Sequence, residues 1–472
     1  MKNKTKTLTV IMLSALAGTA GAEVLTVGPS LTDFDYLTIT AAIAGSASGD
    51  EIVIAPGIYP ENLTISGKDL TLRNAGGGTV TIFGQGLARC LILTGGTDME
   101  VVLQDLIFTG GFDDVGAGIA VGQAYTAIIN NCIIEGNDAT NEGGGMYISG
   151  VAILTDVIIR GNTAGVRGGG IVSTTSSGFT TTLVDCVFED NTAANGGAYA
   201  YAKPGELATI VGCSFRNNTA TSRGGAIAVY GTASAGTLRV DDSMFDSNRA
   251  DDAGGAIWVS DQDVFRAVNS VFVGNSAANA GGVTRNEQLF EATNCTFYDN
   301  GVDAAGVNDS FESNRADADT NLLNCIVVND SSGSWSGPGV LFPRYSLIPD
   351  IANTEPDASG NFTGDPAFVD AAGGDLRLSA GSLAIDAGDS LGALGSVSIV
   401  TLATDYAGQN RNLDDPDTTN IGVPAWALNI DLGAFEYQPD AQPDCLADLN
   451  GDGVLDFFDV SQYLNLFSAG CP

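Results

Sequence analysis

The chain has 472 residues, of which 56 are acidic and 19 basic, giving a net charge of −37. A surface this negative repels phosphate backbones and anionic membranes, so nucleic acid is excluded as an expected partner. The sequence contains no histidine, which excludes a histidine-based catalytic triad, a histidine-ligated zinc ion and the commonest general base.

Residues 1–22 have the pattern of an export signal. Three lysines within the first six residues precede an apolar run over residues 8–17, and Ala-Gly-Ala at 20–22 offers a cleavage site. A retained N-terminal anchor is the alternative, but the run is shorter than the roughly 20 apolar residues that span a bilayer, and no later stretch reaches that length. We expect a secreted or cell-surface protein that begins near Glu23 and has no transmembrane segment. Cleavage would remove three lysines and no acid, changing the net charge from −37 to −40.

The stretch 36–44 has the apolar spacing of a helix and is followed by a strand-like segment at 51–57. Open ends of a stacked β-structure expose strand edges that have to be covered. We therefore predict an N-terminal helical cap for the repeat that follows it.

The central sequence repeats every 25 to 30 residues. One position of the repeat, often cysteine, is occupied in turn by Leu106, Cys132, Val157, Cys186, Cys213, Ser243, Ser270, Cys295 and Cys325. A pair of glycines keeps the same phase, beginning at Gly143, Gly168, Gly196, Gly224, Gly254 and Gly281. Alternating runs such as 226–230 and 256–259 indicate strands with one buried face. The period is that of one coil of a parallel β-helix.

Stacking coils about 4.8 Å apart superimposes equivalent side chains into columns. We predict an interior column of Phe188, Phe215, Phe245, Phe272 and Phe297, beside a cysteine column that is buried and reduced. We also predict an asparagine ladder of Asn137, Asn162, Asn191, Asn218, Asn248, Asn275 and Asn300. It should occupy a corner where asparagine tolerates the left-handed conformation. The glycine pairs should serve the next corner, where φ is positive or a Cβ would clash.

These motifs resemble known families. Residues 31–345 resemble right-handed parallel β-helix proteins of the pectate-lyase-like superfamily. The Phe-x-x-Asn and Gly-Gly-Ala-Ile signatures at 245–248 and 254–257 are similar to repeats of chlamydial polymorphic outer-membrane proteins, which implies adhesion at a cell surface. Residues 364–436 are similar to the tail of secreted bacterial β-helix proteins with varied anchors, which implies closing coils ahead of a sorting module and no chemistry.

Residues 448–459 match a twelve-residue calcium-binding loop. Side-chain oxygens at positions 1, 3, 5, 9 and 12 and a carbonyl at position 7 would come from Asp448, Asn450, Asp452, Asp456, Asp459 and Val454. Gly453 would permit the sharp turn, and hard oxygen ligands suit Ca²⁺; an acidic turn without metal is the alternative. Cys445 and Cys471 bracket this segment and are predicted to form a disulfide, because exported proteins meet an oxidising environment.

The calcium loop and the helix expected at 458–467 resemble those of dockerins, as well as the dockerin-like tails of planctomycete exported proteins. This resemblance implies a sorting or cohesin-like partner for the C-terminal module.

The predicted fold is all-β: a right-handed parallel β-helix solenoid with an N-terminal helical cap and a small C-terminal α calcium-loop module. The expected segments are a signal peptide at 1–22, parallel β-helix repeats at 23–345, terminal coils and an anchor-associated region at 346–438, a linker at 439–444, and the dockerin-like loop and helix at 445–472.

Two classes of function fit this organisation. The first is a non-catalytic scaffold, either adhesive, structural or one that binds polysaccharides or cell-surface glycans. The alternative is a polysaccharide lyase or glycoside hydrolase acting on acidic polysaccharide. Hydrolysis would need carboxylates about 5 to 10 Å apart across a groove. The pairs Asp113–Asp114 and Asp251–Asp252 lie in turns, where solvated acids are common, and 111–114 resembles one polygalacturonase motif without its companions.

A lyase would need a cationic base on the coil surface. The candidates are Arg160, Arg167, Arg216, Arg223, Arg249 and Arg266. Each lies near a corner and none belongs to a recognisable motif, so we assign no catalytic or organic-cofactor residue and favour the binding scaffold.

Overall fold

The computed structural model describes residues 22–174, 180–201, 207–230, 237–260, 263–303, 310–328, 335–348, 358–391, 393–394, 397–398, 403–411, 413–422 and 429–438. The calcium-loop residues, Cys445, Cys471 and all but the last residue of the expected signal peptide lie outside these ranges.

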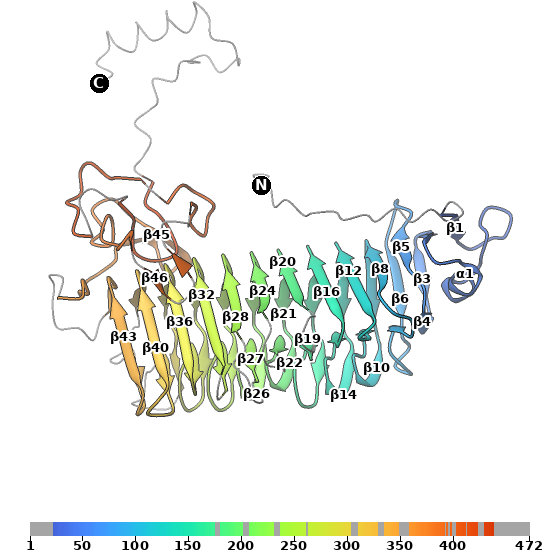
Figure 1. The fold of residues 1–472 in the computed structure, drawn as a ribbon, viewed down its shortest axis with the longest axis horizontal. Helices are drawn as coiled ribbons and strands as arrows, with labels where there is room; N and C mark the ends of the chain where they lie inside the picture. The colour runs from blue at the N-terminus through green and yellow to red at the C-terminus, as the bar shows by residue number, and fades with distance from the viewer. Residues whose placement is uncertain are drawn as a thin grey trace, which may run out of the picture.

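Four long parallel sheets in the described residues form one solenoid (Figure 1). We call them sheets A, B, C and D. Sheet A consists of β1 (Val24–Val27), β2 (Asp50–Ile54), β5 (Leu70–Asn74), β8 (Met99–Gln104), β12 (Tyr125–Asn130), β16 (Val151–Thr155), β20 (Thr181–Val184), β24 (Leu207–Val211), β28 (Thr237–Asp241), β32 (Val264–Val268), β36 (Leu289–Thr293), β40 (Asp319–Leu323) and β43 (Val340–Arg344). Sheet B consists of β3 (Gly57–Tyr59), β6 (Val80–Phe83), β9 (Leu106–Thr109), β13 (Ile133–Glu135), β17 (Ile158–Arg160), β21 (Val187–Glu189), β25 (Ser214–Arg216), β29 (Met244–Asp246), β33 (Val271–Val273), β37 (Thr296–Tyr298) and β41 (Ile326–Val328).

Sheets C and D complete each coil. Sheet C consists of β4 (Leu63–Ser66), β7 (Leu91–Thr94), β11 (Ile119–Val121), β15 (Met146–Ile148), β19 (Ile171–Ser173), β23 (Tyr199–Tyr201), β27 (Ile227–Val229), β31 (Ile257–Val259), β35 (Thr284–Asn286), β39 (Phe311–Ser313) and β42 (Trp335–Ser336). Sheet D consists of β10 (Phe112–Val115), β14 (Asp138–Glu142), β18 (Thr163–Ala164), β22 (Thr192–Asn195), β26 (Thr219–Arg223), β30 (Arg249–Ala250), β34 (Ser276–Ala277) and β38 (Gly301–Val302). From β8 to β41 the chain passes through A, B, D and C in that order, so the predicted parallel β-solenoid is confirmed.

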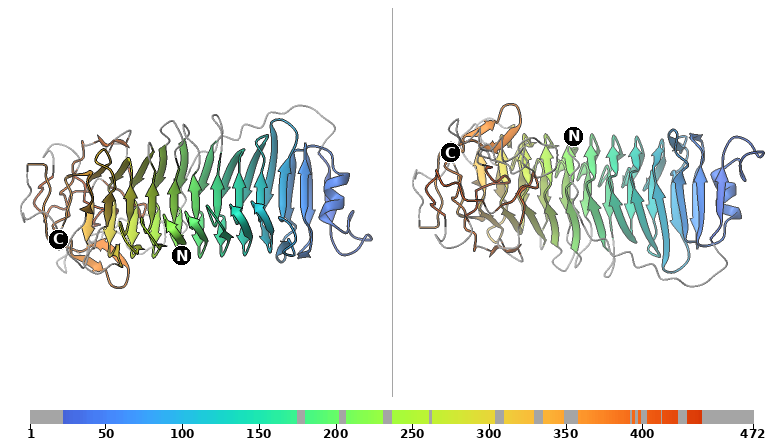
Figure 2. Two further views of the ribbon diagram at one scale, coloured as in Figure 1. Left: turned by 90° about the horizontal axis from the view of Figure 1, so that it is seen from below. Right: turned by 90° about the horizontal axis from the view of Figure 1, so that it is seen from above.

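Helix α1 (Ile39–Gly45) lies at the N-terminal end of the solenoid (Figures 1 and 2). It starts three residues after the predicted span because Thr38 is its N-cap: the Thr38 hydroxyl oxygen accepts a hydrogen bond from the Ala41 amide at 3.2 Å. Ile39, Ala42 and Ile43 are buried and join the solenoid core.

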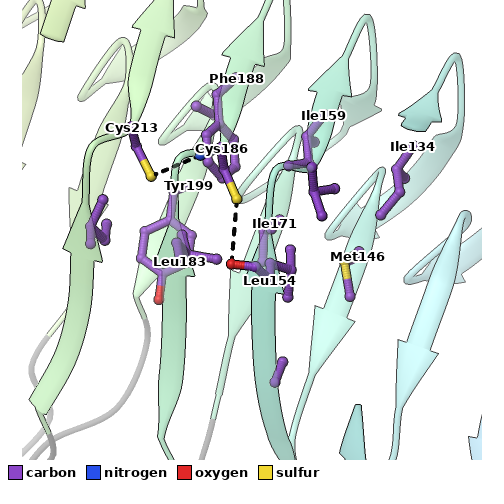
Figure 3. Packing of buried hydrophobic residues seen from close by; sticks show 14 of the residues in the cluster. Ile134, Met146, Leu154, Ile159, Ile171, Leu183, Cys186, Phe188, Tyr199 and Cys213 are labelled. Atoms are coloured by element: carbon purple, nitrogen blue, oxygen red, sulfur yellow. Dashed lines mark hydrogen bonds between the residues drawn. The ribbon is translucent and has the colours of Figure 1, made fainter. Parts of the chain in front are cut away.

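The interior is filled by columns of apolar side chains, as predicted. The five phenylalanines stack ring on ring, with centroid separations of 4.8, 4.8, 4.6 and 4.9 Å along the column. Figure 3 shows Ile134, Ile159 and Phe188 in one such row, with Cys186 and Cys213 beside it. The five cysteines of the predicted column are buried free thiols, as predicted, and so is Cys90, which lies outside that column before β7.

A hydrogen bond and a strand pairing show which cysteines of the column lie on neighbouring coils. The Cys186 amide donates to Cys213 Sγ at 3.4 Å, so these cysteines occupy neighbouring coils. Cys295 and Cys325 are neighbours too, because Thr296 pairs with Ile326. Burial raises the pKa of the Cys90 and Cys132 thiols to about 12, which keeps them protonated.

The asparagine ladder is confirmed, but the conformation expected for it is wrong. From Asn137 to Asn275, each side-chain amide donates to the side-chain oxygen of the next coil, for example Asn191 to Asn218 and Asn218 to Asn248, both at 3.0 Å. The left-handed residue is the one before each asparagine, as at Asp190 (φ 55°) and Asn217 (φ 53°). The preceding residue makes the turn, which leaves the ladder asparagine buried and free to bond along the stack.

The glycine pairs behave as predicted. The first glycine of each pair has positive φ, as at Gly196 (61°) and Gly224 (66°). The second has no room for a side chain: a Cβ on Gly197 would lie 2.4 Å from the Gly225 carbonyl oxygen. The corner between sheets D and C therefore requires glycine for two separate reasons.

Beyond β43 the chain continues sheet B briefly and then folds back. Single parallel bridges join Ile326 to Leu347 and Leu347 to Phe362. The described parts of residues 366–438 form a lobe beside the last coils (Figure 1), containing the antiparallel pairs β44 (Phe368–Asp370) with β45 (Asp375–Leu378) and β46 (Ala393–Leu394) with β47 (Val397–Ser398). Phe368, Leu376 and Phe435 pack against sheet B residues such as Val271. No helix in the described ranges is long and apolar enough to cross a membrane.

Candidate functional site

The outward face of sheet C carries a column of dissimilar side chains. Register places Tyr147, Val172, Ala200, Ala228, Trp258, Arg285 and Glu312 in this column. The residues flanking Trp258, Ile257 and Val259, belong to the core, so with side chains alternating along a strand the column faces away from it. The backbone of the left-handed glycine at the D-to-C corner lies close to this column. At Gly116, for example, an added Cβ would lie 2.8 Å from Tyr147 Cβ.

Two aromatic rings and two arginines meet on this face. Tyr230 directly follows β27, and its ring packs edge-on against Trp258 of β31, with centroids 4.9 Å apart and planes at 71°. The guanidinium of Arg167 lies over the Tyr230 ring at 4.9 Å, and that of Arg223, at the end of β26, lies over Trp258 at 5.3 Å. Cations in this position are attracted to the ring faces.

The guanidinium groups on this face are neutralised by carboxylates of neighbouring coils. Arg167 pairs with Glu142 at 2.8 Å. Arg223 lies 3.3 Å from Asp252 and 3.8 Å from Glu287, and Arg285 lies 3.8 Å from Asp252 and 3.3 Å from Glu312. We call these nine residues the aromatic–arginine strip: Glu142, Arg167, Arg223, Tyr230, Asp252, Trp258, Arg285, Glu287 and Glu312.

The strip runs along the solenoid axis. It extends from the coil of β15 to that of β39, which are six steps apart in sheet C, or about 29 Å at roughly 4.8 Å a step. Such a length suits a chain-like ligand lying parallel to the axis better than a single small molecule.

Two uncharged hydrogen-bond donors in the strip have no partner; Arg285 Nε also makes no hydrogen bond, but it lies 3.3 Å from a Glu312 carboxylate oxygen. The Tyr230 hydroxyl and the Trp258 indole Nε1 are both buried, and neither makes a hydrogen bond. Burial also raises the pKa of Tyr230 far above its ordinary value, so the hydroxyl stays protonated. An unsatisfied buried donor costs about 1 to 3 kcal/mol, and a ligand offering acceptors here would recover that energy.

The acidic candidates from the sequence each contact other side chains of the protein. Asp113 is bound by Arg89 at 2.8 Å, and this arginine lowers the pKa of Asp113. The Asp114 carboxylate accepts from the Thr140 hydroxyl at 2.9 Å. Asp251 lies 3.5 Å from Arg249, whereas Asp252 belongs to the strip.

Sequence reasoning named two of the three strip arginines and missed both aromatic residues. Arg167 and Arg223 were among the six candidates; Arg160, Arg216, Arg249 and Arg266 instead pair with acids outside the strip. The missed signal was in the repeat alignment, where Trp258 occupies the middle strand position that Ala228 and Ala200 fill in preceding coils.

The predicted metal ligands Asp448, Asn450, Asp452, Val454, Asp456 and Asp459 lie outside the described residues. Within the ranges that the structure covers, no group of three or more acidic or cysteine side chains is arranged to hold a metal ion.

Comparison with known proteins gives one family match. Residues 89–276 match the right handed beta helix region. No curated protein matches the chain.

Three solved structures are similar to the chain at low identity. Pectate lyase Pel9A is 14% identical with a TM-score of 0.44, covering 81% of this chain and 95% of the lyase. The PL6 family alginate lyase AlyGC is 14% identical with a TM-score of 0.45, covering 74% and 54%. A pectin methylesterase in complex with a hexasaccharide is 13% identical with a TM-score of 0.24, covering 74% and 94%. The family match over residues 89–276 identifies the stacked coils of that segment as a right-handed β-helix.

Proposed function

We propose that this chain is a secreted or cell-surface β-helix that binds glycans without cleaving them, and that the aromatic–arginine strip is its binding face. The observation that carries the proposal is the pair of unpartnered donors, Tyr230 OH and Trp258 Nε1, beside arginines on a repeating surface. Ligand sites combine aromatic surface with a few placed polar groups in this way.

The charges of the strip support binding rather than hydrolysis. A glycoside hydrolase needs one carboxylic acid that stays protonated and a second carboxylate nearby. Glu142, Asp252, Glu287 and Glu312 are each ion-paired with an arginine. These ion pairs hold the carboxylates on arginines of the protein, whereas a general acid has to be placed against the leaving-group oxygen of the substrate.

The proposal also includes the expected export signal and the predicted calcium loop. The leader at 1–22 would deliver the protein to the exterior. The loop with Asp448, Asn450, Asp452, Val454, Asp456 and Asp459 would bind Ca²⁺ and order a C-terminal module that attaches the protein to a sorting or cohesin-like partner.

Affinity electrophoresis of the full chain through gels containing different polysaccharides tests the binding face. We expect at least one polymer to retard the wild type, and Trp258→Ala to abolish the retardation. Phe342→Ala is a matched control, because this aromatic residue is 49% exposed and lies on sheet A. Unchanged retardation of Trp258→Ala, or release of unsaturated or reducing ends from any polymer, would contradict the proposal.

A further inference from the structure

We infer that the strip takes a neutral polysaccharide and not an acidic one. This inference rests on the glycan-binding function proposed above and specifies the class of its ligand. It follows from which groups of the strip are already paired and which are free to bond.

The cationic groups of the strip already have anionic partners. Arg167, Arg223 and Arg285 each lie within 3.3 Å of a carboxylate oxygen of the protein. The strip contains these three arginines and four acidic residues, Glu142, Asp252, Glu287 and Glu312, so its net charge is not positive. A uronate entering it would have to displace a built-in carboxylate and approach a chain of net charge −37.

Of the three strip donors that make no hydrogen bond, two are uncharged, and the third, Arg285 Nε, lies 3.3 Å from a Glu312 carboxylate oxygen. Tyr230 OH and Trp258 Nε1 are both unbonded, and Trp258 is only 6% exposed. By contrast, the Tyr147 hydroxyl in the same outward column accepts a hydrogen bond from the Thr174 hydroxyl at 3.1 Å. Neutral donors match the hydroxyl and ring oxygens of an uncharged sugar, because such acceptors need no counter-charge.

A flexible side chain lies over the indole ring. Arg223 covers the Trp258 ring and is itself 35% exposed. If the arginine moved aside, the ring face could pack on a sugar, and the arginine would keep its acidic neighbours. Removing Arg223 would also leave Asp252 paired, because Arg285 lies 3.8 Å from it and the Asn279 amide donates to it at 3.2 Å.

The test compares charge removal with donor removal in the full chain. Wild type, Arg223→Ala, Tyr230→Phe, Trp258→Phe and the control Tyr147→Phe are titrated calorimetrically with a neutral β-glucan and with polygalacturonate. Titrations are run at about 0.05 M and about 0.5 M NaCl, where screening differs strongly. EDTA is present, because calcium could bridge acidic groups of the protein and the polymer.

For a neutral ligand we expect β-glucan binding that is the same at both salt concentrations. Arg223→Ala should strengthen it, because this change uncovers the Trp258 ring. Tyr230→Phe and Trp258→Phe should each weaken it about 3- to 10-fold, the value of one neutral hydrogen bond. Tyr147→Phe should leave it unchanged. Binding of polygalacturonate that weakens with salt and is lost in Arg223→Ala would overturn the inference and leave the glycan-binding function standing. Failure to bind either polymer, or any polymer in the electrophoresis panel, would overturn both.

Discussion

The C-terminal lobe contains a cluster of buried carboxyl groups, which makes the stability of the lobe depend on pH. Asp386, Asp405, Asp431 and Glu436 are at most 3% exposed, and Arg411, which is fully buried, is the cation among them, 3.7 Å from Glu436. Burial raises the pKa of Asp405, Asp431 and Glu436. Burial, reinforced by the charges of Asp414 and Asp415, raises the pKa of Asp386 to about 6.

Asp386→Asn should stabilise the lobe at alkaline pH. One Asp386 carboxyl oxygen accepts from the Asp415 amide at 3.1 Å, which an asparagine oxygen can replace, and the other has no partner. A pKa raised from 3.8 to about 6 would cost at most about 3 kcal/mol at pH 8. Because the neighbouring Asp414 is exposed and solvent screens its charge, we expect a gain of about 1 to 2 kcal/mol.

The direction of the pH dependence follows from proton linkage. A carboxyl group with a raised folded-state pKa stabilises the fold fully below its unfolded pKa of about 3.9, and this stability is lost as the pH rises through the folded value of about 6. The variant should therefore exceed the wild type at pH 8 and match it at pH 4. Scanning calorimetry of the full chain at both pH values measures this, with the exposed Asp417→Asn as control. A gain equal at both pH values, or no gain at pH 8, would refute the reasoning.

Three further predictions concern the ladder, the corner and the calcium loop. Asn218→Ala should destabilise the solenoid by about 3 kcal/mol or more in urea unfolding, because it removes buried hydrogen bonds, among them those from the Asn191 backbone amide and side-chain amide to Asn218 and that from Asn218 to the Phe188 carbonyl. A loss under about 1 kcal/mol would contradict the ladder's role. Gly197→Ala should lower the free energy of unfolding by about 1 to 3 kcal/mol in the same assay, since its Cβ would lie 2.4 Å from a carbonyl oxygen. The control Gly161→Ala has open space around the new Cβ and should show only the smaller cost of positive φ. Asp452→Ala should abolish calcium uptake by the full chain in calorimetric titration and leave solenoid melting unchanged, because distant modules behave additively; uptake by the variant at wild-type affinity would rule out this loop.

The sequence predicted those parts of the fold that the repeat itself encodes. A fixed register forces equivalent residues into columns, so the phenylalanine stack, the cysteine column and the asparagine ladder could be named in advance. The backbone conformation of the ladder asparagines could not be predicted in this way. The asparagine supplies the hydrogen-bonding side chain, but the residue before it adopts the left-handed conformation that makes the turn. At Asn217–Asn218 both are asparagines, and only the first has positive φ.

The C-terminal lobe could not be predicted from the repeat, because its contacts join segments distant in sequence. The Asn269 side chain donates to the Thr404 carbonyl at 2.8 Å, and the Ala434 amide donates to the Thr296 hydroxyl at 2.9 Å. In the column of left-handed corner residues, where aspartate and asparagine both occur, Asn269 and Asn324 make hydrogen bonds to the lobe. Amides are suited to such covered positions because they donate and accept without carrying charge into the interface.

The aromatic–arginine strip escaped sequence analysis because its members differ from their equivalents in neighbouring coils. Core positions must repeat, since each column packs against copies of itself, but an outward position on sheet C can change from Ala228 to Trp258 to Arg285 over successive coils without altering the register. Stacking then places these unlike residues about 4.8 Å apart, close enough for rings, cations and carboxylates to interact. A parallel β-helix thus separates stability, carried by residues that recur, from recognition, carried by residues that depart from the repeat. In such a chain, departures from the repeat on an outward column are the most direct guide to a binding site.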